Sequence, residues 1–467
     1  MVSFILPGNS TSGGYEVANS LRFDDGSSDY LSRTVGAGNR NTWTWSGWIK
    51  RSTLGTDQCL FDTYVHGNDQ FRTNFADTDR VSMRFYNGTE YQLGTTRKFR
   101  DTSAWVHLVF VADTTNGTEA DRFRIYVNGV RETALSDVAY PPQNLQMSIN
   151  DSNTFQIGRR QSTNYFDGYM AEVVFIDGTA LDADSFGEFD EDSPTIWKPK
   201  DVSGLTFGTN GFHLDFEDSS SLGNDAAGSN NFSVSNLTSG DQSTDTCTNN
   251  FATMNPLASQ SGSNASSSVA TFSDGNLVVD AISSETVIAN IGVDTGKWYW
   301  EVKVLTDQDG LAIGAVNQHF HLDAEIGYNS PSSPSAAKVF AYYGGNGNKY
   351  TTVGDGSQLS SYGNAIAEDD IIGVALNLDD DEVVFYKNGT AQNSGTAISL
   401  TALGSGEQYF PAVGNWSASA IKLSFNFGSP QFSISSGNSD GNGYGNFEYS
   451  VPSGYYALNT KNLAEYG

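Results

Sequence analysis

Three acidic residues stand at alternating positions of one short segment: Glu188, Asp190 and Asp192. On a β-strand such residues point to the same side, and glycoside hydrolysis uses two carboxylates that face each other across the scissile bond. Glu191 separates two of them, however, and Ser193-Pro194 follow at once. A solvated acidic loop explains this composition better than a catalytic strand does. We therefore expect no catalytic residues and no enzymatic activity, with polysaccharide depolymerisation as the least favoured function.

Carboxylate clusters are candidates for binding Ca²⁺, which takes several oxygen ligands from a curved loop. The candidate ligands are Asp24, Asp25 and Asp29. The acidic run 379–382 stands where a turn should join two strands, so we interpret it as turn chemistry. His319 and His321 would place two imidazoles on one side of a strand or loop, but no third ligand is evident. Calcium is the one cofactor that the sequence suggests, and none is certain.

Aromatic side chains in predicted loops are the candidates for ligand binding. Loops carry much of protein function, and an exposed ring can stack on a sugar. Trp416 lies in a predicted turn over residues 414–417, and Tyr342 and Tyr343 stand directly before Gly344-Gly345. Tyr328 completes this set.

One sequence pattern, an apolar strand that ends in Asn-Gly, occurs twice in the chain, and the strands around it must position such loops. Residues 123–130 read Phe-Arg-Ile-Tyr-Val-Asn-Gly-Val, and residues 383–390 read Val-Val-Phe-Tyr-Lys-Asn-Gly-Thr. Asn-Gly between alternating apolar residues predicts a tight β-hairpin, because both central positions of the turn need positive φ. Short strand patterns surround each hairpin, and no long helical pattern appears. We predict an all-β protein with two tandem antiparallel β-sandwiches.

The chain divides into five predicted segments. They are an N-terminal arm (1–20), a first sandwich (21–200), an irregular connector (201–265), a second sandwich (266–430) and a C-terminal tail that closes on the second sandwich (431–467). The connector is rich in Gly, Ser, Asn and Asp, with one predicted strand at 212–216. Because a free linker of this composition would be flexible, we expect the connector to pack on another surface if it is ordered.

The charge balance limits the partners. The chain has 54 acidic and 25 basic residues, giving a formal net charge of −29. Binding to nucleic acid needs local positive charge, so we expect no nucleic-acid partner. No apolar stretch approaches the length of a membrane span, and residues 1–7 do not resemble a signal peptide. Cys59 and Cys247 are either two free thiols or one bridge, and the sequence leaves both open.

The first sandwich resembles the laminin-G-like domains of the concanavalin A-like lectin family. Three segments carry the resemblance: residues 44–50 (Thr-Trp-Ser-Gly-Trp-Ile-Lys), 105–113 (Trp-Val-His-Leu-Val-Phe-Val-Ala-Asp) and 166–173 (Phe-Asp-Gly-Tyr-Met-Ala-Glu-Val). They follow the family's order over about 180 residues. Because lectin-like sandwiches often carry Ca²⁺ at their loop edges, the resemblance implies a metal role for Asp24, Asp25 and Asp29.

The second sandwich resembles a SPRY domain. Its segments are 296–302 (Gly-Lys-Trp-Tyr-Trp-Glu-Val), 370–379 (Asp-Ile-Ile-Gly-Val-Ala-Leu-Asn-Leu-Asp) and 409–413 (Tyr-Phe-Pro-Ala-Val). In SPRY domains the loops at one edge of the sandwich form the binding surface. Carried over to this chain, the resemblance implies ligand binding by Tyr328, Tyr342, Tyr343 and Trp416.

The tandem arrangement resembles structural proteins of marine tailed bacteriophages, on residues 20–23, 29–34 and 456–460. It implies a virion protein, in a fibre or a surface decoration, that is made in the host cytoplasm and released by lysis. We expect a homo-oligomer without membrane insertion that binds host-surface glycans, neighbouring virion proteins, or both. The alternative is a capsid or tail decoration protein used only in assembly, with no glycan binding.

Overall fold

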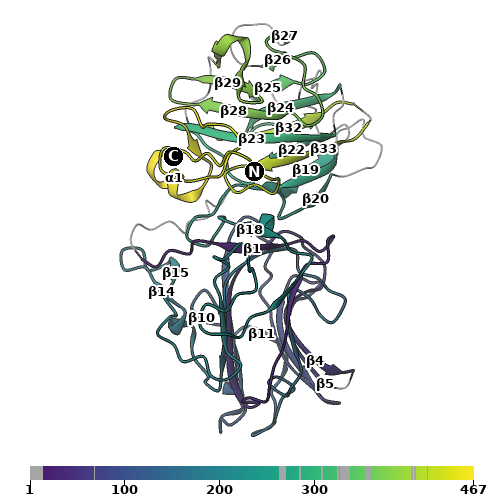
Figure 1. Cartoon of the computed structure of the whole chain (residues 1–467), viewed down its shortest axis with the longest axis vertical. Coiled ribbons are helices and arrows are strands. Elements are labelled where there is room, and N and C mark those ends of the chain that lie inside the picture. Colours follow the sequence, from purple (N-terminus) through teal and green to yellow (C-terminus); the bar gives the residue numbers. More distant parts are fainter. Residues whose placement is uncertain are drawn as a thin grey trace. The chain divides into compact units, whose positions relative to one another are not determined.

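A computed structural model shows the chain as two compact units, Pro7–Asn250 and Phe251–Gly467, here called the first and second unit. It describes residues 14–67, 69–261, 270–282, 285–306, 309–322, 326, 337–352, 359–400, 403, 406–417 and 419–467. Both units consist of β-sheets whose strands pair almost entirely in the antiparallel sense, so the predicted fold class is confirmed (Figure 1). The single α-helix of these residues, α1 (Thr460–Tyr466), is short, and none of their helices has the length and apolar character of a membrane span.

The first unit contains two large sheets, which we call sheet A and sheet B. Sheet A has the order β10 (Val130–Arg131), β9 (Phe123–Val127), β8 (Val106–Asp113), β3 (Thr42–Arg51), β13 (Gly168–Asp177), β1 (Ser20–Phe23) and β18 (Gln242–Ser243), and β16 (Phe212–Leu214) also pairs with β13. Sheet B has the order β11 (Leu135–Ala139), β7 (Glu90–Thr95), β6 (Val81–Tyr86), β5 (Asp69–Phe75), β4 (Gln58–His66), β12 (Thr154–Ile157), β2 (Tyr30–Thr34) and β17 (Ser233–Ser235). Short elements complete the unit: β14 (Gly187–Phe189) pairs with β15 (Trp197–Pro199), and η1 (Glu119–Asp121), η2 (Ala183–Ser185) and η3 (Ser239–Asp241) are 3-10 turns.

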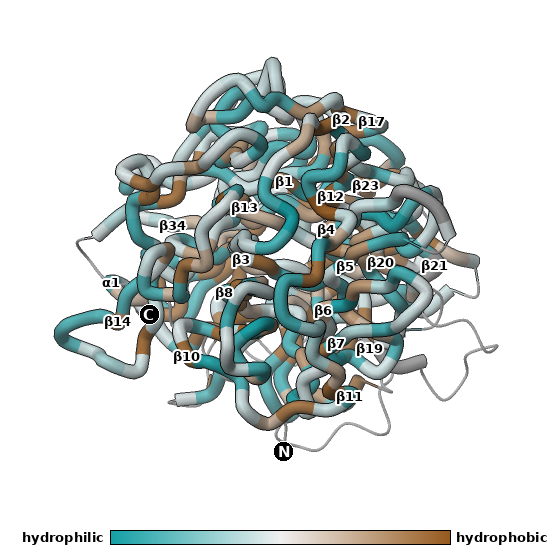
Figure 2. Tube along the Cα trace, turned by 90° about the horizontal axis from the view of Figure 1, so that it is seen from below, coloured by the Kyte–Doolittle hydropathy of each residue, from teal (hydrophilic) through white to brown (hydrophobic). Residues whose placement is uncertain are grey.

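Aromatic rings fill the space between sheets A and B. Trp43 meets Phe71 edge to face at 4.7 Å between ring centroids, and Phe155 meets both Phe61 (5.1 Å) and Phe175 (5.3 Å) in the same way. All five side chains are fully buried. Hydrophilic and hydrophobic residues are intermixed along the trace (Figure 2). In β6 of sheet B, buried and half-buried residues alternate, so this strand turns its apolar side to the core and its polar side outward.

The outer face of sheet A is also covered. A second apolar cluster lies there, with Trp48, Trp105, Tyr169, Trp197 and Cys247 among its buried members. This explains why β13 is buried at all ten positions, a pattern that simple alternation does not predict. The outer face of sheet B has no such cover among the described residues, which makes it the open face of the first unit.

Residues 201–250 differ from the irregular connector that we expected. They belong to the first unit and contribute β16, β17 and β18 to its sheets. Isolated apolar residues in this polar segment reach the core: Phe212 stacks on Phe175 at 5.8 Å, and Phe232 meets Phe212 at 4.8 Å. Polar segments with a few well-spaced anchors of this kind give no periodic signal, so the sequence pattern missed two of the three strands.

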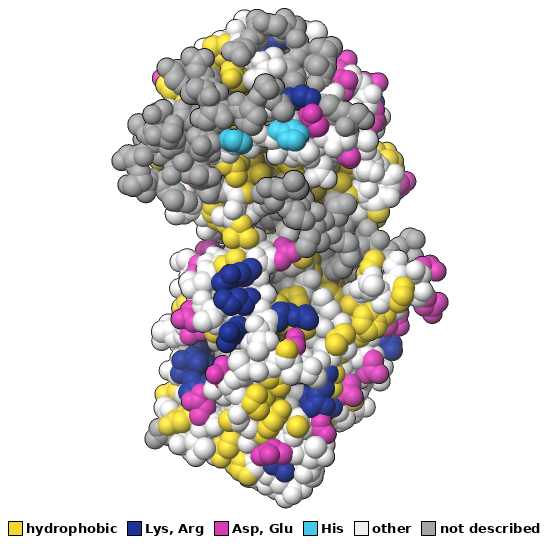
Figure 3. All heavy atoms as spheres, turned by 180° about the vertical axis from the view of Figure 1, so that it is seen from behind, with side chains coloured by type: hydrophobic (Ala, Val, Ile, Leu, Met, Phe, Trp, Pro, Cys, Tyr) yellow, Lys and Arg dark blue, Asp and Glu magenta, His cyan; other side chains and the backbone are white. Residues whose placement is uncertain are grey.

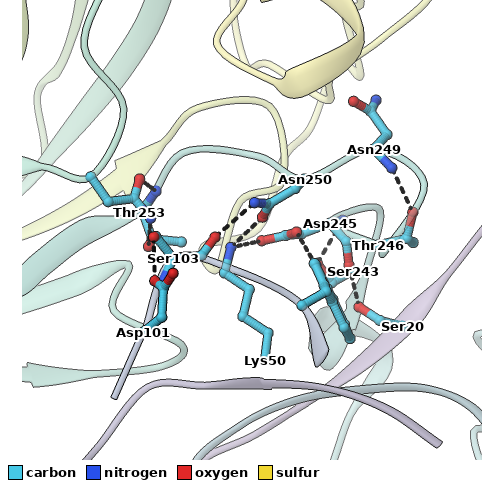
Figure 4. Close-up of polar contacts among 12 residues, drawn as sticks. Ser20, Lys50, Asp101, Ser103, Ser243, Asp245, Thr246, Asn249, Asn250 and Thr253 are labelled. Carbon is cyan, nitrogen blue, oxygen red and sulfur yellow. Dashed lines mark hydrogen bonds and ion pairs between the residues drawn. The ribbon is translucent and has the colours of Figure 1, made fainter. Parts of the chain in front are cut away.

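A buried lysine fixes the end of this segment. Lys50 Nζ donates hydrogen bonds to Asp245 Oδ2 and Asn250 Oδ1, both at 2.7 Å (Figure 4). Asp245 also accepts from Trp105 Nε1 at 3.1 Å, and its carbonyl accepts from Ser20 Oγ at 2.6 Å. Because a buried charge is tolerated only when it is paired and hydrogen-bonded, this network holds residues 245–250 on sheet A.

The two cysteines form no disulfide, which settles the alternative that the sequence left open. Cys59 and Cys247 are both buried and free. Burial raises the pKa of both thiols well above the ordinary value. They therefore stay protonated near neutral pH and act as small apolar side chains.

The two Asn-Gly hairpins form as predicted. Asn128 and Gly129 have φ of 45° and 79°, and Asn388 and Gly389 have φ of 49° and 73°. Positive φ at both central residues defines the turn type that matches the twist of the flanking strands. The Asn128 side chain adds a hydrogen bond from the backbone N–H of His107 at 2.8 Å, which ties the turn to the neighbouring strand.

The second unit is also built from two large sheets, called sheet C and sheet D. Sheet C has the order β19 (Met254–Ser261), β22 (Glu285–Ala289), β32 (Tyr409–Asn415), β24 (Leu311–Asn317), β25 (Val339–Tyr343), β26 (Asn348–Thr351) and β27 (Leu359–Ser361). Sheet D has the order β20 (Thr271–Ser273), β21 (Val278–Ile282), β33 (Ile421–Asn426), β23 (Lys297–Thr306), β28 (Ile371–Asn377), β29 (Glu382–Lys387) and β30 (Thr390–Ala391), with β31 (Ile398–Ser399) on β29 and β34 (Tyr456–Ala457) on β23. One 3-10 segment, η4 (Gln392–Gly395), follows β30.

A buried carboxylate holds the C-terminal segment of the second unit on sheet D. Glu301, in β23, is fully buried and accepts four hydrogen bonds. The donors are the backbone N–H groups of Glu448 (2.9 Å) and Tyr449 (2.8 Å), Asn426 Nδ2 (3.1 Å) and the Tyr299 hydroxyl (3.1 Å). Burial raises the pKa of Glu301 in spite of these donors. Strand β34 adds a parallel pairing with β23 further along the same segment.

Candidate functional site

The open face of sheet B carries two rows of side chains set by strand register. Residues directly opposite each other in an antiparallel pair share a face. The first set, which we call the arginine row, runs through β12, β4, β5, β6 and β7 and consists of Gln156, Asp62, Arg72, Arg84 and Gln92. The second set, called the tyrosine row, crosses the same strands two residues along and consists of Thr154, Tyr64, Gln70, Tyr86 and Glu90. At about 4.8 Å between strands, each row spans roughly 19 Å.

Asp62 is the buried centre of the arginine row. Its side chain is 0 % exposed, and neither carboxylate oxygen has a well-formed hydrogen bond within the described residues. Burial raises the pKa of Asp62 to about 7, although the charge of Arg160, the backbone N–H of Gln161 and the charge of Arg72 oppose the shift. An ionised carboxylate in this buried position lowers the stability of the folded state, and groups with such shifted pKa values are concentrated at functional sites.

The arginines around Asp62 are only partly neutralised. Arg84 pairs with Glu90 at 2.6 Å, and Arg160 Nη2 donates to Gln70 Oε1 at 2.8 Å. Arg72 makes no ion pair or hydrogen bond among the described residues, and its buried Nε has no acceptor. Burial lowers the pKa of Arg72, and the neighbouring charges of Arg160 and Arg84 lower it further. The face therefore keeps uncompensated positive charge.

Aromatic rings border this charge. Arg159, next to Arg160 in the loop after β12, lies 3.2 Å from the centroid of the Tyr30 ring, and Arg84 lies 5.8 Å from that of Tyr86. Figure 3 shows Lys and Arg side chains gathered on one face of the first unit, interspersed with apolar and acidic groups. Half-buried tyrosines beside fixed planar donors can stack on the apolar face of a sugar while hydrogen-bonding its oxygens.

Two of the predicted aromatic ligand-binding residues of the second unit differ from the expected loop residues, and Trp416 lies outside a strand as expected. Tyr342 and Tyr343 are not loop residues: they end β25, where Tyr342 is fully buried in the core and Tyr343 is 7 % exposed. The strand pattern of residues 338–343 is confirmed by β25, so these two tyrosines stand at the end of a strand and not in the loop that follows it. Trp416 follows β32 and is 36 % exposed; its ring stacks on Tyr343, and its Nε1 donates to the Tyr343 hydroxyl. Tyr328 lies outside the described residues.

The three predicted calcium ligands do not converge on one point. Asp29 is 2 % exposed, and its Oδ2 accepts the backbone N–H of Asp24 at 2.9 Å. Asp24 Oδ2 in turn accepts the backbone N–H of Ser27 at 2.9 Å. Burial raises the pKa of Asp29 to about 6 and also raises that of Asp25, where the charge of Asp24 contributes. Among the described residues no group of three or more acidic, His or Cys side chains is arranged to hold a metal.

We therefore expect calcium to leave the stability of the first unit unchanged. A metal present at a hundred times its dissociation constant would stabilise the fold by about 2.7 kcal/mol, which corresponds to roughly 5–10 °C in Tm for a unit of this size. Thermal unfolding after EDTA treatment, with and without added Ca²⁺, checks this. A rise of that size, lost in an Asp29→Asn variant, would show that the loop rearranges to bind the ion.

The acidic segment first considered for catalysis forms a turn and an ion-pair cluster. Asp190 Oδ1 accepts the backbone N–H groups of Asp192 (3.0 Å) and Ser193 (2.8 Å), as a turn-capping residue does. Lys198 lies 3.6 Å from Glu188 and 3.4 Å from Asp190. The hydrogen bond from Ser193 and the charge of Lys198 lower the pKa of Asp190, so it is ionised at neutral pH.

Sequence reasoning missed the arginine row. Its signal was present in part: residues 81–86 alternate between apolar and polar types, which places Arg84 and Tyr86 on the outer side of a strand. The register that brings Arg84, Arg72 and Asp62 together joins strands whose pairing no local pattern specifies. Arg160 comes from a loop and had no signal.

The comparisons with known proteins agree with this architecture. Residues 25–185 match the family described as the concanavalin A-like lectin/glucanases superfamily, and residues 297–430 match the SPRY domain. The chain thus contains one domain of each kind, and both predicted domain resemblances are confirmed. The resemblance to bacteriophage structural proteins stays a prediction.

Individual relatives match over parts of the chain. An ATP-dependent RNA helicase, Ddx1 of Drosophila melanogaster, is 33% identical over 143 residues, which are 31% of this chain and 17% of the helicase. The SPRY domain of human HERC1 is 16% identical with a TM-score of 0.28, covering 37% of this chain and 96% of that domain. A putative carbohydrate-binding protein of Bacteroides ovatus is 18% identical with a TM-score of 0.32, covering 48% of this chain and 61% of its own.

Proposed function

We propose that this protein is a non-enzymatic structural protein of a tailed-bacteriophage particle that binds host-surface glycans through the open face of sheet B. It assembles as a homo-oligomer in a fibre or surface decoration, and its other surfaces contact neighbouring particle proteins. The match to a lectin/glucanase superfamily supports the glycan ligand, and the tandem resemblance stated above supports the particle.

The observation that carries the proposal is the pair of half-buried tyrosine rings in the tyrosine row. Tyr64 and Tyr86 lie on either side of Gln70 on three adjacent strands, each with its ring half-buried at the outer face. Two rings on one face of the sheet, with polar side chains between and beside them, suit an extended sugar chain, because rings stack on sugars and polar groups pair with hydroxyls.

Loss of the tyrosines should weaken glycan binding. In a panel of bacterial surface polysaccharides immobilised on a sensor, Tyr64→Ala and Tyr86→Ala should each reduce affinity roughly two- to tenfold, the value of one aromatic contact. Tyr444→Ala, in the second unit, serves as a matched control and should bind like the wild type. Wild-type binding that is unaffected by both substitutions would remove the tyrosine row from the site.

Two further assays test the remaining parts of the proposal. Incubation with every polysaccharide that binds should release no reducing ends; their release, abolished in Glu188→Gln, would identify a depolymerase instead. Peptides of this chain should be found by mass spectrometry in purified particles of the phage that encodes it. Particles without them would refute the virion role.

A second candidate, an assembly protein without glycan binding, is favoured by an apolar patch on the first unit. Val130 is 58 % exposed and Phe189 is 42 % exposed. Phe189 packs edge to face on Trp197 at 4.9 Å, and Gly129, the neighbour of Val130, lies against the same indole. Apolar side chains that gather at one exposed spot mark contact sites between proteins. Binding to no polysaccharide, with oligomers dissociated by Phe189→Asp, would favour this function.

A further inference from the structure

We infer that the open face of sheet B selects acidic glycans, whose carboxylate or sulfate groups bind to Arg72, Arg84 and Arg160. This inference rests on the proposed function and adds the chemical class of the ligand. It concerns the arginine row and the loop beside it, which the proposed sugar-stacking contacts do not use.

The three guanidinium groups lie on one side of the sheet around a common centre. Arg72 and Arg84 are direct cross-strand partners, and Arg160 is held at the next row by its bond to Gln70. Each of the three has a buried Nε without an acceptor. Arg72 lies opposite Asp62 in the strand register but forms no ion pair or hydrogen bond among the described residues, and it is only half-buried, so a ligand can approach its guanidinium group.

Like charges in this arrangement need a counter-charge. The proximity of Arg160 and Arg84 disfavours the charged form of Arg72 and is reflected in its lowered pKa. Asp62 lies beneath them, but it is fully buried and half-protonated near neutral pH, so it compensates them poorly. A ligand anion would relieve the repulsion, and the planar fork of arginine pairs with carboxylate or sulfate through two parallel hydrogen bonds.

The setting favours an acidic glycan over other polyanions. The chain as a whole carries a net charge of −29, which repels nucleic acid with its dense phosphate charge. A sugar chain with one acidic group per residue or fewer carries lower charge density. It also offers apolar ring faces to Tyr64 and Tyr86, which lie on the strands of Arg72 and Arg84 or next to them.

The test compares three polymers with the same backbone: dextran, carboxymethyl-dextran and dextran sulfate. Titration by calorimetry at low salt should show binding of at least one anionic polymer, at least about tenfold tighter than that of dextran, with the two anionic arms distinguishing carboxylate from sulfate recognition. Affinity should fall as salt rises, because the ions screen the contact. The Arg72→Gln/Arg160→Gln variant should lose roughly tenfold or more of this affinity.

The matched control is Arg131→Gln, which removes the same charge from β10 in sheet A, and it should bind like the wild type. Removing Arg72 relieves repulsion, so we expect the double variant to fold; thermal unfolding verifies this. Equal binding of the three dextrans, equal losses in both variants, or tighter binding of single-stranded DNA than of either anionic dextran would overturn the inference. Neutral-glycan binding that persists in those cases would leave the proposed function intact.

Discussion

Replacement of Glu301 by Gln is expected to lower the free energy of unfolding of the second unit by about 2–4 kcal/mol. All four partners of this carboxylate are hydrogen-bond donors: two backbone N–H groups, the Asn426 amide and the Tyr299 hydroxyl. A glutamine side chain keeps one acceptor oxygen and puts an NH2 group where the second oxygen was. One pair of donors would then face another donor in a buried site.

The loss should be localised first at the C-terminal segment. Two of the four hydrogen bonds reach Glu448 and Tyr449, which are 147 and 148 residues away in sequence, and β34 follows them. Because stability differs between parts of a structure, amide hydrogen exchange of residues 440–460 should accelerate before that of β28.

Chemical denaturation of wild type, Glu301→Gln and the control Glu382→Gln measures the effect. Glu382 is exposed at the start of β29, so the same chemical change there should alter stability by less than about 0.5 kcal/mol. Equal stability of the Glu301→Gln variant and the wild type would mean that the buried amide finds new hydrogen-bond partners. The four hydrogen bonds accepted by Glu301 would then not be needed to hold the C-terminal segment.

The Glu301 site illustrates what the sequence could and could not predict. The strand at 296–302 was visible from its resemblance to a SPRY segment, and the two hairpins from Asn-Gly, because these signals are local. The partners of Glu301 lie in a Gly- and Ser-rich tail whose path depends on tertiary contacts. The same holds for residues 201–250, where two of the three short strands, β17 and β18, are specified by pairing with sheets B and A rather than by their own pattern.

The candidate binding residues also divide into those that a local sequence pattern reveals and those that depend on tertiary contacts. Tyr342 and Tyr343 were grouped with the loop aromatics because Gly344-Gly345 follow them, although the strand pattern over residues 338–343 agrees with β25. The arginine row was hidden because alternation identifies the outer side of one strand but not its neighbours. What the sequence showed was the type of fold; which polar side chains meet on its open face depends on the exact register between paired strands, and alternation within each strand does not fix that register.

Asp62→Asn is expected to stabilise the first unit at high pH. The pKa of Asp62 in the folded protein, about 7, lies above the ordinary value of 3.8. Between these values the folded state holds a proton that the unfolded state has lost, so stability falls as pH rises through this range. Above pH 7 the full penalty is present. It amounts to about 4 kcal/mol at most, because each tenfold change in the proton equilibrium is worth about 1.4 kcal/mol.

Denaturation at pH 3.5 and pH 8.5 separates this effect from ordinary changes in packing. The amide group that replaces the carboxyl group cannot ionise, so Asp62→Asn should exceed the wild type by a few kcal/mol at pH 8.5 and by almost nothing at pH 3.5. Asp77→Asn, at an exposed turn of the same unit, should show no such difference between the two pH values. A variant that is less stable than the wild type at pH 8.5 would mean that attraction to Arg72 and Arg160 outweighs burial. A stability gain at pH 8.5 would instead mean that the chain keeps this carboxylate beneath the arginine row at the expense of its own stability, as expected for a residue retained for binding rather than for folding.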